Sequence, residues 1–102
     1  MAALLLLRVA AAWPLPGLGL LALPEGPTPH LAAYELHTAL AVEVALPDGT
    51  RQAATATVEE VTRPETPDAV ARGLLLEFEK PMVVVPGTEI WLPATDATRQ
   101  IA

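Results

Sequence analysis

Few side chains in this chain of 102 residues are of the types that catalyse reactions. Cysteine and serine are both absent, and no threonine lies in the sharp turn that would expose a nucleophile. No Gly-x-x-x-x-Gly-Lys-[Ser/Thr] loop is present either, so the chain lacks the phosphate cradle of a nucleotide hydrolase. We therefore predict that the protein is not an enzyme and holds no cofactor.

The two histidines are the first candidates for a metal site. His30 and His37 lie seven residues apart, with Glu35 between them. This spacing matches no compact ligand motif, and His30 follows a Pro-Thr-Pro segment that we expect to be a loop. Exposed histidines are the better interpretation, and we predict no metal site.

Carboxylates are the other candidates for chemistry. Glu77 and Glu79 fall on one face of a predicted strand, and paired carboxylates can work as acid and base. Carboxylates that point outward from a strand also keep an apolar domain in solution. We favour this second interpretation, because no further catalytic group accompanies the pair.

The charge of the chain limits its partners. The formal net charge is −6, and the six basic residues form no run. Binding to DNA, RNA or an acidic membrane depends on clustered Lys and Arg. The basic residues are spread over the chain: Arg8, Arg51, Arg63, Arg72, Lys80 and Arg99. We therefore expect no DNA partner and no membrane partner, and the charge disfavours RNA.

The location of the protein is inferred from its apolar segments. The run at 2–7 has no basic residue before it, as a secretory signal would, and no stretch reaches the roughly 20 apolar residues of a membrane span. We expect a cytoplasmic protein. Eleven prolines and the absence of asparagine are typical of thermophilic proteins, and we predict a thermophilic source.

A hairpin is the clearest local prediction. Residues 40–46 alternate between large apolar side chains and small or charged ones, the period-two pattern of a half-buried strand. The alternation resumes over 51–61, after a Pro-Asp-Gly turn at 47–49. Two such segments joined by a tight turn predict a β-hairpin.

The second half of the chain continues in short segments. Residues 62–72 contain two prolines and four charges, so we predict a surface loop with one helical turn at 67–70. Strands are expected over 73–79, 82–85 and 88–92, with a Pro-Gly turn at 86–87.

The first segment is ambiguous between strand and helix. Residues 3–13 are rich in alanine and leucine, which lead the helix-propensity scale. Pro16-Gly17 then predicts a turn into a second apolar strand at 19–23. We favour a first strand, because a single helix fits poorly in a chain of short alternating strands.

Several short strands with turns between them indicate an all-β fold. We predict a small antiparallel β-barrel of about six strands in a Greek-key arrangement, closed or partly open. Closure would remove the edges that such apolar strands otherwise expose. The barrel domain is expected to span residues 1–93, and 94–102 to form a C-terminal tail.

In this order of strands the sequence resembles the second domain of translational GTPases of the elongation factor Tu type. The segments that carry the resemblance are LLRVAAAWPLPGLGLLALPEG at 6–26, VEVALPDGTRQAATATVEEVTR at 42–63 and RGLLLEFEKPMVVVPGTEIWL at 72–92. The chain departs from the family at Leu18, where an arginine is usual between the two glycines, and at 26–37, which looks like an insertion. The resemblance implies a six-stranded barrel standing alone, without its GTPase domain.

The resemblance also implies a binding site. In that family a glutamate at the end of the Val-Glu strand packs against the terminal adenosine of aminoacyl-tRNA, and a nearby arginine supports it. The matching positions are Glu59 or Glu60, and Arg63. Solvated charges at a strand end are the alternative, and the net charge of −6 favours it.

Two hypotheses for function follow. The first is a non-catalytic binding module of the translation-factor type that contacts a protein or RNA. The second is a structural protein that forms a homo-oligomer through apolar side chains on the outside of its strands. Trp91 and Leu75 are the candidate interface residues, because both are predicted to point outward. For Trp91, packing in the core at one end of the barrel is an equal alternative.

Overall fold

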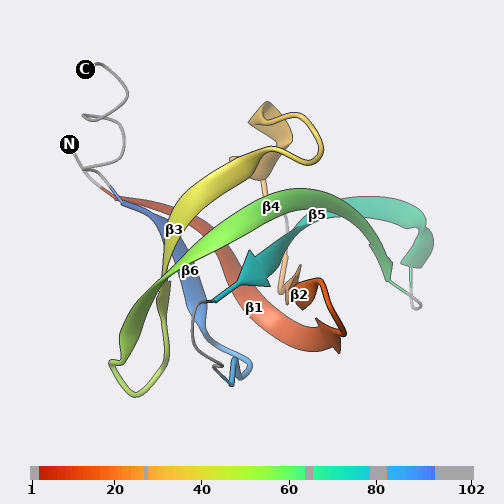
Figure 1. Cartoon of the computed structure of the whole chain (residues 1–102). Helices are drawn as coiled ribbons and strands as arrows, with labels where there is room; N and C mark the ends of the chain where they lie inside the picture. Colours follow the sequence, from red (N-terminus) through yellow and green to blue (C-terminus); the bar gives the residue numbers. More distant parts are fainter. Residues whose placement is uncertain (1–2, 27, 64–65, 79–82, 94–102) are drawn as a thin grey trace.

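The computed structural model describes residues 3–26, 28–63, 66–78 and 83–93, and gives the backbone alone over 62–63 and 66–70. Six antiparallel strands close into a barrel in the order β1-β2-β5-β4-β3-β6 (Figure 1). No α-helix lies within the described residues. The strands are β1 (Leu4–Leu15), β2 (Gly19–Pro24), β3 (Ala39–Ala45), β4 (Arg51–Arg63), β5 (Thr66–Glu77) and β6 (Glu89–Leu92), with one 3-10 helix, η1 (Leu31–Ala33). The predicted all-β barrel is confirmed.

The topology is a Greek key. β3, β4 and β5 follow one another as hairpins, and β2 lies beside β5 and not beside β3. The chain from β2 to β3 therefore makes a long connection, and η1 lies in it.

The predicted hairpin at 40–61 is confirmed. Val42 pairs with Ala54, and Asp48 accepts a hydrogen bond from the Thr50 N–H at 2.8 Å, which closes the turn. Val44 and Val58 are fully buried, as the alternation predicts.

Residues 4–15 form a strand, so the helical alternative for this segment is wrong. Leu4–Arg8 pair with β6 and Val9–Leu15 pair with β2. These pairings hold the segment extended and override its helix propensity. The pairing of β1 with β6 shifts between Leu5 and Leu7, which is a bulge. Because of it, Leu6 and Leu7 are both buried although they are adjacent in sequence.

The surface loop predicted at 62–72 is wrong. β4 continues to Arg63 and β5 begins at Thr66, so the two strands make one long hairpin with no helical turn. Prolines misled the prediction. Pro67 lies in the irregularity between the Arg63–Thr66 and Thr62–Val70 pairs, and a bulge tolerates a residue without an N–H.

The strand predicted at 82–85 is also wrong where the structure describes it. Residue 82 lies outside the described part, and Val83–Val85 belong to no strand. Hydrogen bonds of a tight turn replace the strand pairing that was expected here. The Thr88 hydroxyl donates to the Val85 carbonyl at 2.7 Å. The Gly87 N–H donates to the Val9 carbonyl at 2.8 Å, and β6 starts only at Glu89.

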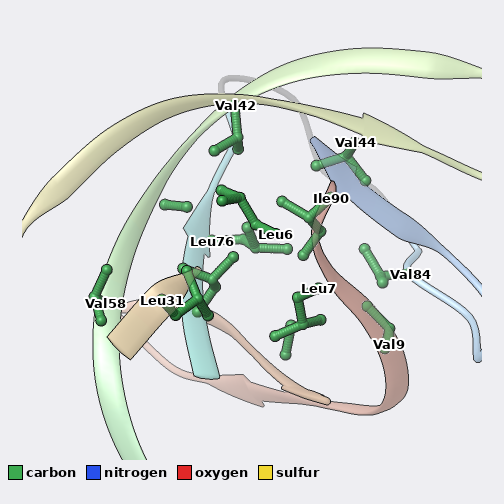
Figure 2. Close-up of a cluster of buried hydrophobic side chains, with 13 residues drawn as sticks. Leu6, Leu7, Val9, Leu31, Val42, Val44, Val58, Leu76, Val84 and Ile90 are labelled. Carbon is green, nitrogen blue, oxygen red and sulfur yellow. The ribbon is translucent and has the colours of Figure 1, made fainter. Parts of the chain in front are cut away.

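The interior of the barrel is filled by aliphatic side chains (Figure 2). Leu31 of η1 points into this cluster and is fully buried, so the connection after β2 closes one end of the barrel. The strands contribute the remaining buried members: Leu6, Leu7, Val9, Ala22, Val42, Val44, Ala56, Val58, Leu74, Leu76 and Ile90, with Val84 from the segment before β6.

Candidate functional site

Glu59 lies on β4 beside the end of the β2–β3 connection. Its Oε1 is 3.2 Å from Nδ1 of His37, whose side chain is 74% exposed. The backbone of His37 has φ of 69°, a left-handed conformation that histidine adopts more readily than most residues. Its N–H donates to the Val58 carbonyl at 2.7 Å, which continues the pairing of β3 and β4 by two residues. Glu59 therefore has a local partner that the sequence did not predict.

Glu60 does not join Glu59 in one site. Side chains of consecutive strand residues point to opposite faces, so Glu59 and Glu60 diverge, and Glu60 is exposed. The Arg63 side chain lies outside the described part of the chain. Arg72, which pairs with Glu60 across the hairpin, donates to the Tyr34 carbonyl at 3.3 Å. The described side chains thus form no common patch for a nucleoside.

The outside of β1, β6, β3 and β4 carries ion pairs, and we call this surface the polar outer face. Arg8 donates to Glu89 at 2.5 Å, and Arg51 is paired with Glu43. Trp91 is partly buried there, and its indole N–H donates to Glu89 at 3.2 Å. The predicted interface residue Trp91 therefore sits among charges, away from Leu75 on β5.

Glu89 gives a pH prediction. Its hydrogen bond to Arg8 holds the pKa of the carboxyl below its ordinary value of 4.5. Because the pKa is lowered, the carboxylate stabilises the folded state at pH values above 4.5. This contribution to stability is lost as the pH falls through the lowered pKa. We expect Glu89→Gln to unfold with a shallower acid dependence than the wild type below about pH 4.5. Chemical denaturation followed at several pH values measures it, and parallel acid slopes for the two proteins would contradict it.

The outside of β1, β2 and β5 carries a row of apolar side chains, with the exposed Glu77 of β5 beside it. Trp13 pairs with Leu21, and Leu21 pairs with Leu75. Directly paired residues of antiparallel strands share a face, and this face is the outer one, because the neighbouring Ala22 and Leu74 are buried in the core. We call Trp13, Leu21 and Leu75 the outer apolar row.

On the next two strands, β4 and β3, uncharged side chains continue the row. Leu75 pairs with Thr57 of β4, and Thr57 pairs with Ala39 of β3. Trp13 is 51% exposed, and Leu18 at the tip of the β1–β2 turn is 60% exposed. Sequence reasoning found Leu75 but missed Trp13. A two-residue turn at 16–17 would have placed Trp13 opposite Leu20, whereas the observed turn spans 16–18 and pairs Trp13 with Leu21.

A concavity lies where β1 extends past the end of β2. Its volume is about 390 Å³, within the range of small ligand sites. Leucines of β1 line one wall, and the segment after β2 forms the other. The lining residues are Leu5, Leu6, Leu7, Arg8, Pro24, Glu25, Gly26, Thr28, Pro29 and His30.

No family model, no curated protein and no solved structure matches the chain. Within the described residues no helix is both long enough and apolar enough to cross a membrane. In the same part of the chain, no three side chains of His, Asp or Glu gather as metal ligands.

Proposed function

We propose that the chain is a non-catalytic interaction module that associates with a second copy of itself through the outer apolar row. The observation that carries the proposal is the cross-strand register Trp13–Leu21–Leu75, which collects three large apolar side chains on one outer surface. Ion pairs cover the polar outer face, so the outside of the barrel has two chemically different sides.

An exposed tryptophan is a strong anchor for an interface. Trp and Tyr dominate the residues whose truncation costs interfaces the most, because they bury large areas with little loss of conformational entropy. Half of Trp13 is in contact with water in the single chain. Contact with an apolar surface would remove that exposed area from water.

The geometry of the row suits a two-fold interface. Leu21 lies between Trp13 and Leu75, one strand spacing of about 4.8 Å from each. A two-fold axis through Leu21 places Trp13 of each copy over Leu75 of the other, so a large side chain meets a smaller one twice. Because each copy carries a net charge of −6, salt should strengthen this association by screening the repulsion.

Leu75→Glu tests the proposal. In the two-fold arrangement the change buries a carboxylate against Trp13 on both sides of the interface, so we expect association to weaken about 30- to 100-fold, or about 2–2.7 kcal/mol. Light scattering behind a sizing column over a range of concentrations measures it. Val83→Glu is the matched control, because it adds the same charge at a position that is 80% exposed and outside the strands.

The same experiment with deacylated tRNA distinguishes self-association from the alternative function, RNA binding. RNA binding through Glu59, Glu60 and Arg63 predicts a monomer whose mass rises with tRNA at moderate salt and whose complex weakens as salt increases. Self-association predicts a mass that rises with protein concentration, ignores tRNA and increases with salt. A mass that stays monomeric at every concentration would contradict our proposal.

A further inference from the structure

The connection between β2 and β3 is held to the barrel by few contacts. Of residues 28–36, only Leu31 is buried, and the others are half-buried or exposed. The N–H groups of Leu31 and Ala32 donate to the Thr28 carbonyl, and that of Tyr34 donates to the Leu31 carbonyl, so these hydrogen bonds lie within the segment. A segment with its own hydrogen bonds and one buried side chain can leave a domain while the rest stays folded.

Arg72 of β5 ties both ends of η1 to the barrel. The Thr28 hydroxyl donates to the Arg72 carbonyl at 3.1 Å, and Nη1 of Arg72 donates to the Tyr34 carbonyl at 3.3 Å. Thr28 precedes η1 and Tyr34 follows it, so one residue of β5 fixes the segment on both sides. Within the part of the chain that the structure describes, these are the only hydrogen bonds from residues 28–36 to a strand.

The segment covers the end of the barrel and one side of the concavity. Leu31 is fully buried and fills the end of the interior (Figure 2). Thr28, Pro29 and His30 line the concavity, which is also lined by Leu6 of the buried core. Movement of residues 28–36 away from the barrel would therefore remove this wall and join the concavity to the space that Leu31 fills.

We propose that residues 28–36 form a lid that opens at this end of the barrel while the six strands stay folded, and that Arg72 is its latch. The lid ends where pairing with β4 begins. The His37 N–H donates to the Val58 carbonyl at 2.7 Å, and the Val58 N–H donates to the Thr38 carbonyl at 2.9 Å. These bonds hold residues 37–38 on β4 and make them the hinge.

Hydrogen exchange of the Leu31 and Tyr34 amides, followed by NMR without denaturant, tests whether the lid opens by itself. Val44→Ala is the informative variant, because Val44 is fully buried and pairs with Ile90 in a part of the interior away from Leu31 (Figure 2). We expect this change to lower the midpoint of urea unfolding but to leave both exchange rates unchanged, since the strands stay folded when the lid opens. If both rates rise by the same factor as the unfolding equilibrium, the lid opens only with the whole domain and the proposal is wrong.

Arg72→Met tests the latch, because it removes the guanidinium donor and keeps an unbranched side chain. We expect it to speed exchange of the Leu31 and Tyr34 amides about fivefold, the effect of losing one hydrogen bond. Arg51→Met is the matched control, since it removes an arginine that is paired with Glu43 on the polar outer face. Equal exchange rates in the two variants would show that Arg72 is not the latch. Wild-type amides that exchange as fast as those of an unfolded chain would show that the lid is not closed.

Discussion

Gly19→Ala is expected to lower the free energy of unfolding by about 3 kcal/mol or more. Gly19 has φ of 137°, which side chains of L-residues rarely permit, and a Cβ built on it would lie 2.3 Å from the Leu76 carbonyl oxygen. That oxygen belongs to β5, which is held by pairing with both β2 and β4. The obstacle is backbone and cannot rotate away, so the β1–β2 turn or the pairing of β2 with β5 has to yield.

Denaturant unfolding of the wild type and of Gly19→Ala measures this loss. Gly17→Ala is the control, because Gly17 is in the same turn with φ of 78° but has no atom within 4 Å of its Cβ position. Its expected loss is about 1 kcal/mol, from backbone strain alone. Equal losses at the two glycines would mean that the close approach to β5 does not constrain the barrel.

Leu76→Ala is expected to lower the free energy of unfolding by about 2–5 kcal/mol. Leu76 is fully buried and lies at the centre of the aliphatic cluster, near Leu6 and Leu31 (Figure 2). A closed barrel has a continuous sheet around its interior, so the walls have little freedom to collapse into the space left by the side chain. Thermal or denaturant unfolding measures the change.

Leu75→Ala is the control for Leu76→Ala, because the two residues are adjacent on β5 and point to opposite faces. At a protein concentration low enough for the single chain, we expect it to cost less than about 1 kcal/mol. The pair thus separates the two roles of the strand, since position 76 should control stability and position 75 association. Similar losses of stability at both positions would contradict the assigned register.

Much of the barrel is predictable from local pattern. The alternation over 40–46 and 51–61 assigns the inner face correctly, because every second residue of these strands faces one core. The turn at 47–49 and the glycine at 17 are also readable, since each needs a backbone that few residues permit. The long β4–β5 hairpin is not, because its residues pair with each other beyond the barrel and tolerate the prolines and charges typical of loops.

The candidate surfaces depend on pairing between distant segments, which the sequence does not display. The resemblance left Glu59 and Glu60 as alternatives for one position, and only the pleat of β4 shows that their side chains point to opposite faces. His37 is 22 residues from Glu59 and reaches it only because the connection after η1 follows the line of β3. Trp13 and Leu75 become neighbours of Leu21 only once β2 is known to lie beside β5.

The most direct test of self-association uses Trp13 as its own reporter. The chain has two tryptophans, so Trp91→Phe leaves Trp13 as the only indole. If two copies meet through the outer apolar row, the emission of Trp13 shifts to shorter wavelengths as protein concentration rises, in step with the increase in mass. Leu75→Glu in the same background should abolish both changes. An increase in mass while the emission of Trp13 stays that of a half-exposed indole would place the interface elsewhere and contradict the proposal.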